Sequence, residues 1–279
     1  MKLLLEIPDV SSNGSEGVKL RLGGMALRNG LLVHGPSHWA VAVRTREGEI
    51  KVASGDKPRL KGMLSELPWV RGVARLGEAF AVIPLVKRAL PEAQLPMQDG
   101  RTLGAMAGAA AAGQALRASG PRTVARELAV AGVSLFPALL ALRGGDLASY
   151  HGVEHKAIAG YEQDKDASDA AKEHERCGSN LVAPMLISTV VGNALARRLL
   201  GARGPIASAA VTIGSAAIAV ELLAWSERHR GTPLANVLKL PGNEIQRLFA
   251  TREPTDEQLD VGRVALAEIL RVEGGVPLR

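Results

Sequence analysis

Four segments of the chain contain no Asp, Glu, Lys or Arg, and they constrain its fold more than any other feature. They cover residues 103–116, 128–142, 181–196 and 205–220. Each is about 14 to 16 residues long, whereas a helix that crosses a bilayer needs roughly 20 apolar residues. Taken singly, each segment is therefore compatible with a buried helix of a soluble protein. Their many Ala and Gly residues also give only a weak hydropathy signal.

Three properties of these segments favour membrane helices. The segments form two pairs, each joined by a short turn (residues 117–122 and 197–204), so that each pair can fold as a hairpin. Small residues such as Gly104, Gly108 and Gly192 allow the close helix packing that is found in lipid. Arginines at the ends can snorkel and lengthen the effective span. We therefore expect a mainly α-helical membrane protein with about four short transmembrane helices in two hairpins.

The region before the hairpins is predicted to contain a small β structure and one helix. Short apolar runs between residues 18 and 60 are separated by turn signals such as Asn29-Gly30, which predicts an antiparallel β meander. A helix is expected at residues 67–90, where Trp69 is followed by basic residues. This pattern suits either a helix at a membrane interface or an ordinary surface helix.

The C-terminal region is predicted to end in an amphipathic helix. Thr255 can cap this helix, and Gln258 completes a capping box. Leucine and isoleucine recur on one face of the helix that follows. In chain order, the predicted parts are a tail (1–17), a β meander (18–60), an interfacial helix (67–90), a first transmembrane hairpin (102–143), a His/Cys loop (144–180), a second transmembrane hairpin (181–225) and a cytoplasmic C-terminal region (226–279).

The charge of the chain favours a membrane surface over nucleic acid as a partner. The formal net charge is +6, but the chain has only two Tyr and three Phe, which leaves no aromatic platform on which bases could stack. If both hairpins span a membrane, most Lys and Arg residues lie on the side that carries both ends of the chain. Loops rich in Lys and Arg stay on the cytoplasmic side. Arginines in both outer turns act against this preference.

Four potential metal ligands lie between the two hairpins, within 27 residues: His151, His155, His174 and Cys177. His151 and His155 are four positions apart, so that both imidazoles lie on one helix face and can reach the same ion. His174 and Cys177 form a His-x-x-Cys pair with the spacing of a tight ligating turn. Imidazole and thiolate suit Zn²⁺, which we predict as the metal. Because Cys177 is the only cysteine, a disulfide within the chain is excluded.

The same segment also has the order His-x-x-Glu-His, in which Glu154 would be the general base of a zinc hydrolase. If both His174 and Cys177 ligate, four ligands close the shell and the site is structural. If only one of them ligates, a position stays open for water. In the alternative without a metal, the histidines are polar loop residues and Glu154 pairs with a nearby cation, either Lys156 or Arg176.

Several stretches of the chain resemble motifs of the YqhQ-like family, a bacterial group of membrane proteins that carries a domain of unknown function. The stretches are Gly23-Gly24-Met25-Ala26-Leu27-Arg28-Asn29-Gly30-Leu31-Leu32-Val33-His34-Gly35-Pro36, Tyr150-His151-Gly152-Val153-Glu154-His155-Lys156, His174-x-Arg176-Cys177-Gly178 and Thr251-Arg252-Glu253-Pro254. All four candidate ligands fall on these motif positions. The chain departs from the family pattern where the family has Gln, Glu and Arg and this chain has Met25, Asn29 and His34.

The resemblance implies an integral protein of the bacterial cytoplasmic membrane with cytoplasmic N- and C-terminal parts. We expect a His/Cys metal site on the cytoplasmic face and a role as an accessory or scaffold for other membrane proteins. The alternative is a membrane-tethered zinc-dependent hydrolase with Glu154 as its base and Cys177 or His174 as the third ligand. The expected partners are the lipid bilayer and other membrane proteins, and not nucleic acid.

Overall fold

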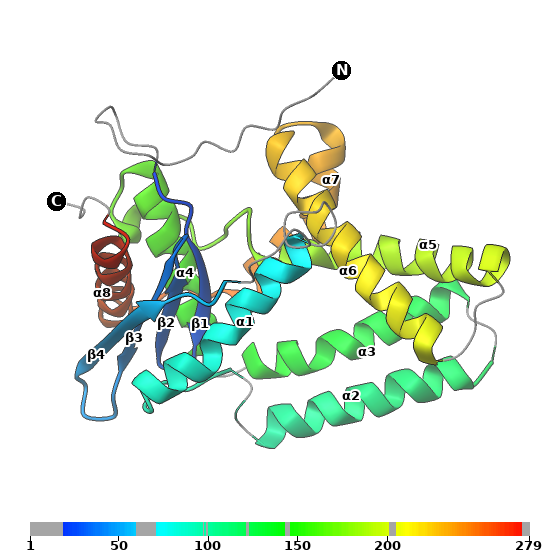
Figure 1. Ribbon diagram of the computed structural model, residues 1–279, viewed down its shortest axis with the longest axis horizontal. Coiled ribbons are helices and arrows are strands. Elements are labelled where there is room, and N and C mark those ends of the chain that lie inside the picture. Colours follow the sequence, from blue (N-terminus) through cyan, green and yellow to red (C-terminus); the bar gives the residue numbers. More distant parts are fainter. Residues whose placement is uncertain are drawn as a thin grey trace.

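The computed structural model describes residues 19–59, 71–96, 98, 100–120, 123–142, 146–200 and 205–274. The tail predicted at residues 1–17 and Trp69 of the predicted interfacial helix lie outside this part of the chain. Figure 1 shows two regions side by side: a sheet with its covering helices, and a group of long helices that extends away from it.

A four-stranded antiparallel sheet forms the N-terminal region, which confirms the predicted meander. Its strands are β1 (Gly23–Leu27), β2 (Gly30–His34), β3 (His38–Arg44) and β4 (Ile50–Asp56), and they are paired in chain order. The β1–β2 register pairs Leu27 with Gly30 across the turn. Each strand therefore continues directly into its neighbour, as short hairpin turns allow.

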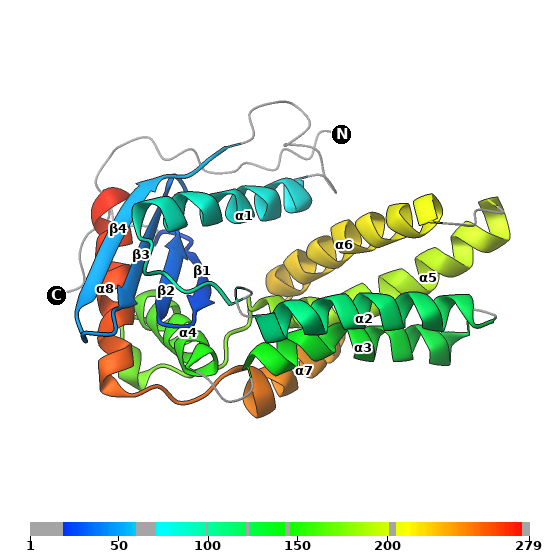
Figure 2. The same cartoon turned by 90° about the horizontal axis from the view of Figure 1, so that it is seen from below.

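Both faces of the sheet are covered by helices. α1 (Arg71–Ala89) packs on one face, where Val82 and Val86 meet Leu32 and Val41. α4 (Leu147–Gln163) and α8 (Asp256–Val272) cover the other face (Figure 2). Because helices cover both faces, β2 is buried along its whole length, and Leu31, Leu32 and Val33 follow one another instead of alternating with polar residues.

α8 has the features that the sequence predicts. The side chain of Thr255 accepts a hydrogen bond from the backbone N–H of Gln258, and the Gln258 side chain accepts one in return from the Thr255 backbone. The apolar face of the helix is buried against the sheet and α4. This arrangement ties α8 to α4, the helix that carries His151 and His155.

The long helices form two antiparallel pairs: α2 (Gly100–Ala118) with α3 (Val124–Leu142), and α5 (Val182–Leu200) with α6 (Pro205–Arg228). Both hairpins are therefore present. In the described residues, three segments are long and apolar enough to cross a membrane: Val124–Leu142, Gly178–Ala196 and Ala209–Arg228. The expectation of four such helices is corrected to three. α2 is not among them, because Ala and Gly supply little hydropathy and two arginines lie near its ends.

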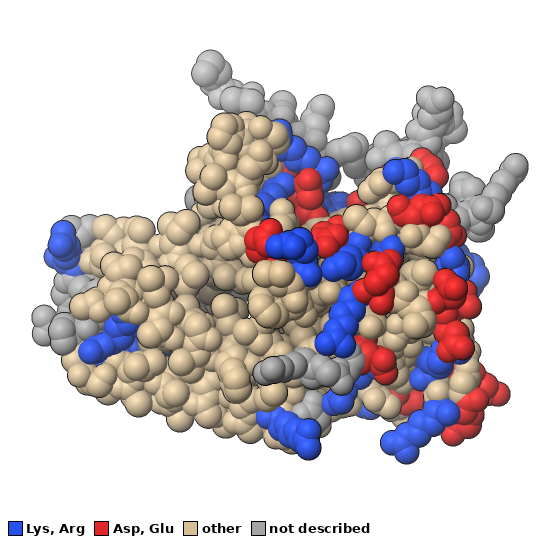
Figure 3. Space-filling model, turned by 180° about the vertical axis from the view of Figure 1, so that it is seen from behind, with Lys and Arg blue, Asp and Glu red and all other residues tan. Residues whose placement is uncertain are grey.

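These helices expose large apolar side chains and few charges. Phe136, Ile187 and Ile213 are each more than half exposed. Figure 3 shows that the part of the molecule extending away from the sheet has almost no charged residues on this face, whereas charges of both signs gather over the sheet region. A soluble protein rarely exposes so large an apolar surface without a partner.

The remaining elements connect the two regions. α4 occupies much of the segment that was predicted as a His/Cys loop, and it is followed by two short 3-10 helices, η2 (Ala167–Asp169) and η3 (Gly178–Leu181). After α6, the chain forms α7 (Pro233–Ile245) and a π-helical turn, η4 (Gln246–Ala250). α7 lies where the long helices meet the sheet region (Figures 1 and 2).

Candidate metal site

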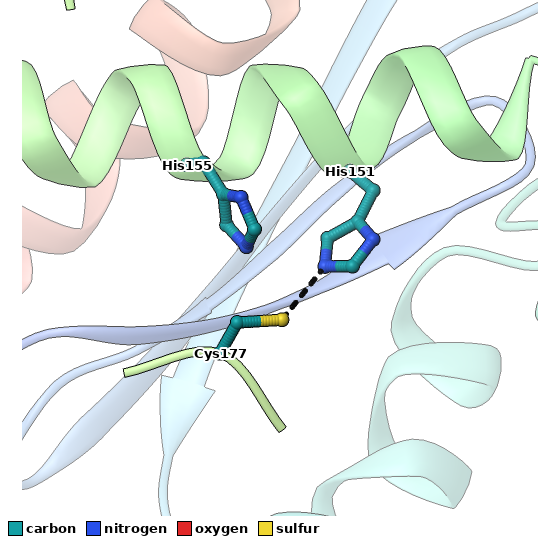
Figure 4. Close-up of side chains that lie close together, drawn as sticks. All are labelled: His151, His155 and Cys177. Atoms are coloured by element: carbon teal, nitrogen blue, oxygen red, sulfur yellow. Dashed lines mark hydrogen bonds between the residues drawn. The ribbon is translucent and has the colours of Figure 1, made fainter. Parts of the chain in front are cut away.

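α4 presents His151 and His155 toward Cys177, which directly precedes η3 (Figure 4). The two imidazole centroids are 4.4 Å apart. The ligand atoms of the three residues all lie within 4.8 Å of one another. The i,i+4 spacing on α4 brings the histidines together, as the sequence predicts, and the turn before η3 supplies the thiol. We refer to His151, His155 and Cys177 as the His/Cys cluster.

Backbone carbonyl groups determine which ring nitrogens face the cluster. Nδ1 of His151 lies 2.9 Å from the carbonyl oxygen of Ala250, and Nδ1 of His155 lies 2.6 Å from that of Lys172. Because a carbonyl oxygen only accepts hydrogen bonds, each Nδ1 must carry the proton. In the neutral imidazole, Nε2 then has a free lone pair. Zinc-ligating histidines are oriented in the same way by a second partner.

One distance in the cluster matches the spacing of two zinc ligands, and one nitrogen atom has no partner. His155 Nε2 is buried and has no hydrogen-bond partner, which is costly unless another group satisfies it. His151 Nε2 lies 3.4 Å from Cys177 Sγ. In a tetrahedral shell with Zn–N near 2.0 Å and Zn–S near 2.3 Å, these atoms would be about 3.5 Å apart. The donor set and this one distance are those that a metal ion such as zinc could use.

His174 lines the same cavity, and its ring centroid lies 5.7 Å from that of His155, but its ligand atoms are not among those grouped within 4.8 Å, so its predicted role as a ligand stays a prediction. Its Nε2 faces Glu162 Oε2 at 3.4 Å, and its Nδ1 accepts from the backbone N–H of Arg176. Both ring nitrogens are thus engaged away from Cys177. Burial raises the pKa of Glu162, but hydrogen bonding to His174 and the charge of Arg176 outweigh it, so the pKa is lowered overall.

Glu154 lies beside the cluster, as the His-x-x-Glu-His order predicts. Its Oε2 is 4.0 Å from His151 Nε2, and both residues line a cavity of about 430 Å³. The cations that could have neutralised it bind other acids: Lys156 pairs with Glu253 at 2.7 Å, and Arg176 pairs with Glu162. Glu154 is therefore placed to act on a molecule in the cavity.

Two glycines allow this arrangement, and sequence reasoning did not assign them a role. A Cβ atom on Gly24 of β1 would lie 2.6 Å from Cγ of Glu154. A Cβ atom on Gly152 of α4 would lie 2.2 Å from the carbonyl oxygen of Arg252. The first glycine leaves room for the carboxylate, and the second lets the segment before α8 approach α4. The doublet Gly23-Gly24 inside a strand was the only signal, since glycine there often marks a close approach.

The three departures from the family pattern lie in different environments. Met25 lines the cluster cavity. The Asn29 side chain donates to the carbonyl oxygens of Arg44 and Glu92, which ties the β1–β2 turn to neighbouring segments. His34 is buried in β2, and burial together with the charge of Lys57 lowers its pKa to about 4. Of the three, Met25 is the one that faces the candidate site.

Comparisons with known proteins agree with the resemblance. Residues 146–272 match the model of a family described as a protein of unknown function, DUF1385. This range includes the whole His/Cys cluster. The chain is also 26% identical over 313 aligned residues to the uncharacterised protein YqhQ of Bacillus subtilis (strain 168), an alignment that covers 90% of this chain and 92% of that protein. No solved structure matches.

Proposed function

We propose that this chain, a member of the YqhQ-like family of unknown function, is a membrane-bound zinc hydrolase that cleaves an ester or amide bond at the membrane surface. The observation that carries the proposal is the three-ligand cluster with the buried, unpartnered Nε2 of His155 beside Glu154. Structural zinc sites have four protein ligands, whereas catalytic sites have three and keep one position open. This favours the hydrolase over the accessory or scaffold role.

The cluster and Glu154 would have different roles in the reaction. His151, His155 and Cys177 would hold zinc, which lowers the pKa of water and polarises a carbonyl oxygen. Glu154 would take a proton from the attacking water and deliver it to the leaving oxygen or nitrogen. The acyl C–O or C–N bond breaks, a new C–OH bond forms, and the products are a carboxylic acid and an alcohol or amine. A single metal with a Glu base suits carbonyl chemistry, while phosphoryl transfer often uses two metals.

Removal of the metal tests this proposal on the wild-type protein. Zinc-loaded protein in detergent should hydrolyse p-nitrophenyl acetate. Treatment with 1,10-phenanthroline should reduce that rate to the level of the buffer, and added zinc should restore it, because the free carboxylate of Glu154 alone is a weak catalyst. The rate of p-nitrophenolate release is the measurement. A rate that survives complete removal of zinc would contradict the proposal.

A position at the bacterial cytoplasmic membrane is supported by the three apolar helices and by their exposed surface. α2 packs along α3 as the other half of a hairpin, and we propose that it crosses with α3. Cys177 directly precedes the candidate span Gly178–Ala196, so the cluster would lie at the membrane surface. The sheet region, which carries many of the Lys and Arg residues, would face the cytoplasm.

α7 and η4 supply a further apolar surface, which would lie at the membrane surface like the His/Cys cluster. Five large apolar side chains are each more than half exposed there: Leu234, Val237, Leu240, Leu248 and Phe249. On the opposite side of α7, buried Lys239 pairs with Glu175 at 3.0 Å. A helix with one apolar and one charged side beside membrane spans is suited to the lipid interface. We propose that α7 and η4 rest in the bilayer surface.

This contact predicts that Phe249 is near lipid chains. In vesicles that contain brominated phospholipids, the added fluorescence of a Phe249→Trp variant should be strongly quenched relative to the wild type. The matched control is Asp260→Trp on the exposed side of α8, whose added fluorescence should be unaffected. Equal quenching of the two variants would contradict the proposed position of η4.

A further inference from the structure

We propose that the substrate is an amphiphile whose labile ester or amide bond lies at the His/Cys cluster while its apolar chain occupies a groove between α2 and α3. This inference rests on the proposed hydrolase function and assigns the class of molecule on which the site acts. It is carried by a second, apolar cavity that shares three lining residues with the cluster cavity.

The second cavity is adjacent to the cluster cavity. It has a volume of about 430 Å³ and lies between α2 and α3. Both cavities are lined by Pro96, Leu142 and Leu147. Leu147 is in the first turn of α4, four positions before His151. A molecule with one end at the cluster can therefore continue past these three residues into the groove.

The groove is suited to an alkyl chain. Its described lining consists of apolar side chains, among them Met106, Ala110 and Ala138, together with the hydroxyl groups of Thr102 and Ser134. The α3 wall belongs to the candidate span Val124–Leu142. If α3 crosses the membrane, the groove lies at the depth of lipid chains while the cluster lies at the surface. A small polar substrate would leave the groove unused.

A different cavity in the bundle differs from the groove by its two charged residues and provides a control. It has a volume of about 450 Å³ and lies between α3 and α5, and its mostly apolar lining includes the two charged residues Arg117 and Glu127. Nε of Arg117 is 4.0 Å from Oε2 of buried Glu127. An apolar chain next to these charged groups would displace the polar surroundings that stabilise them. Ala131 lines this cavity on α3, seven positions before Ala138 of the groove.

Alkyl hydroxamates on cobalt-substituted protein test the inference without turnover. The hydroxamate group chelates an open metal position and changes the visible absorption of Co²⁺, and its alkyl chain can extend into the groove. Acetohydroxamate, octanohydroxamate and dodecanohydroxamate would be titrated in the same detergent. Octanohydroxamate should bind at least about 50-fold more tightly than acetohydroxamate, at roughly twofold to fourfold per buried methylene.

Two variants locate the chain. Ala138→Trp should fill the groove and remove most of the increase in affinity that a longer alkyl chain gives. Acetohydroxamate should bind to this variant as it does to the wild type. Ala131→Trp, the matched change in the other cavity, should preserve the full gain. If affinity increased equally with chain length in Ala138→Trp and in the wild type, the amphiphile inference would be overturned. The proposed hydrolase function would not be, because the open metal site would still be intact. Failure of acetohydroxamate to alter the cobalt spectrum of the wild type would overturn the proposed function and the inference with it.

Discussion

Cys177→Ser is expected to reduce bound zinc from about one equivalent per chain to nearly none after dialysis. The thiolate is one of only three protein ligands in the cluster, and two imidazoles alone hold zinc weakly. Loss even of a group that orients a ligand costs about 10- to 100-fold in metal affinity, so loss of the ligand itself should exceed that. Zinc content by mass spectrometry and competition with a chelator of known affinity are the measurements.

His174→Ala is the matched control for this experiment. His174 lies on the same short turn, three residues before Cys177, but its ring nitrogens face Glu162 and Arg176. This variant should therefore keep its zinc. Loss of zinc from His174→Ala, or full retention of zinc by Cys177→Ser, would show that the ligand set is different from the one the structure brings together.

Glu154→Gln is expected to lower the rate of p-nitrophenyl acetate hydrolysis by about 10²- to 10⁴-fold, which is the usual contribution of a general base. Its zinc content should be unchanged, because the carboxylate lies beside the cluster and is not one of its three ligands. Glutamine has nearly the same shape but cannot accept a proton at neutral pH. Kinetic assays at equal zinc occupancy are the measurement.

Glu162→Gln is the corresponding control. Glu162 is also on α4, eight residues after Glu154, and it interacts with Arg176 and His174 instead of with the cluster ligands. Its rate should stay within a few-fold of the wild type. If both substitutions reduced the rate equally, the effect would come from disturbance of α4, and the assignment of Glu154 as the base would be wrong.

Local patterns predicted those parts of the fold that depend on neighbouring residues. The turn signal at Asn29-Gly30 predicted a β hairpin, and Thr255 with Gln258 predicted the start of α8; both are present. The prediction of four membrane-spanning helices was wrong for α2, because a helix can pair into a hairpin without having high hydropathy. The helix α7 was not predicted, because Pro241 and Gly242 within it resemble a helix break.

The candidate site was only partly accessible from the sequence. The i,i+4 spacing was enough to bring His151 and His155 together, because a helix fixes that geometry. The sequence left open whether His174, Cys177 or both ligate, because spacing in a turn does not show which way each side chain points. The carbonyl groups of Lys172 and Ala250, which fix the tautomers, come from distant segments and carry no residue-type signal.

Zinc K-edge X-ray absorption of the purified wild-type protein tests the central claim most directly. A site formed by His151, His155 and Cys177 predicts one sulfur ligand near 2.3 Å, two imidazole nitrogens near 2.0 Å and one further light atom from solvent. It also predicts that the spectrum changes when acetohydroxamate is added. A spectrum with three imidazoles and one sulfur, unchanged by acetohydroxamate, would mean a closed structural site that includes His174 and would contradict the hydrolase.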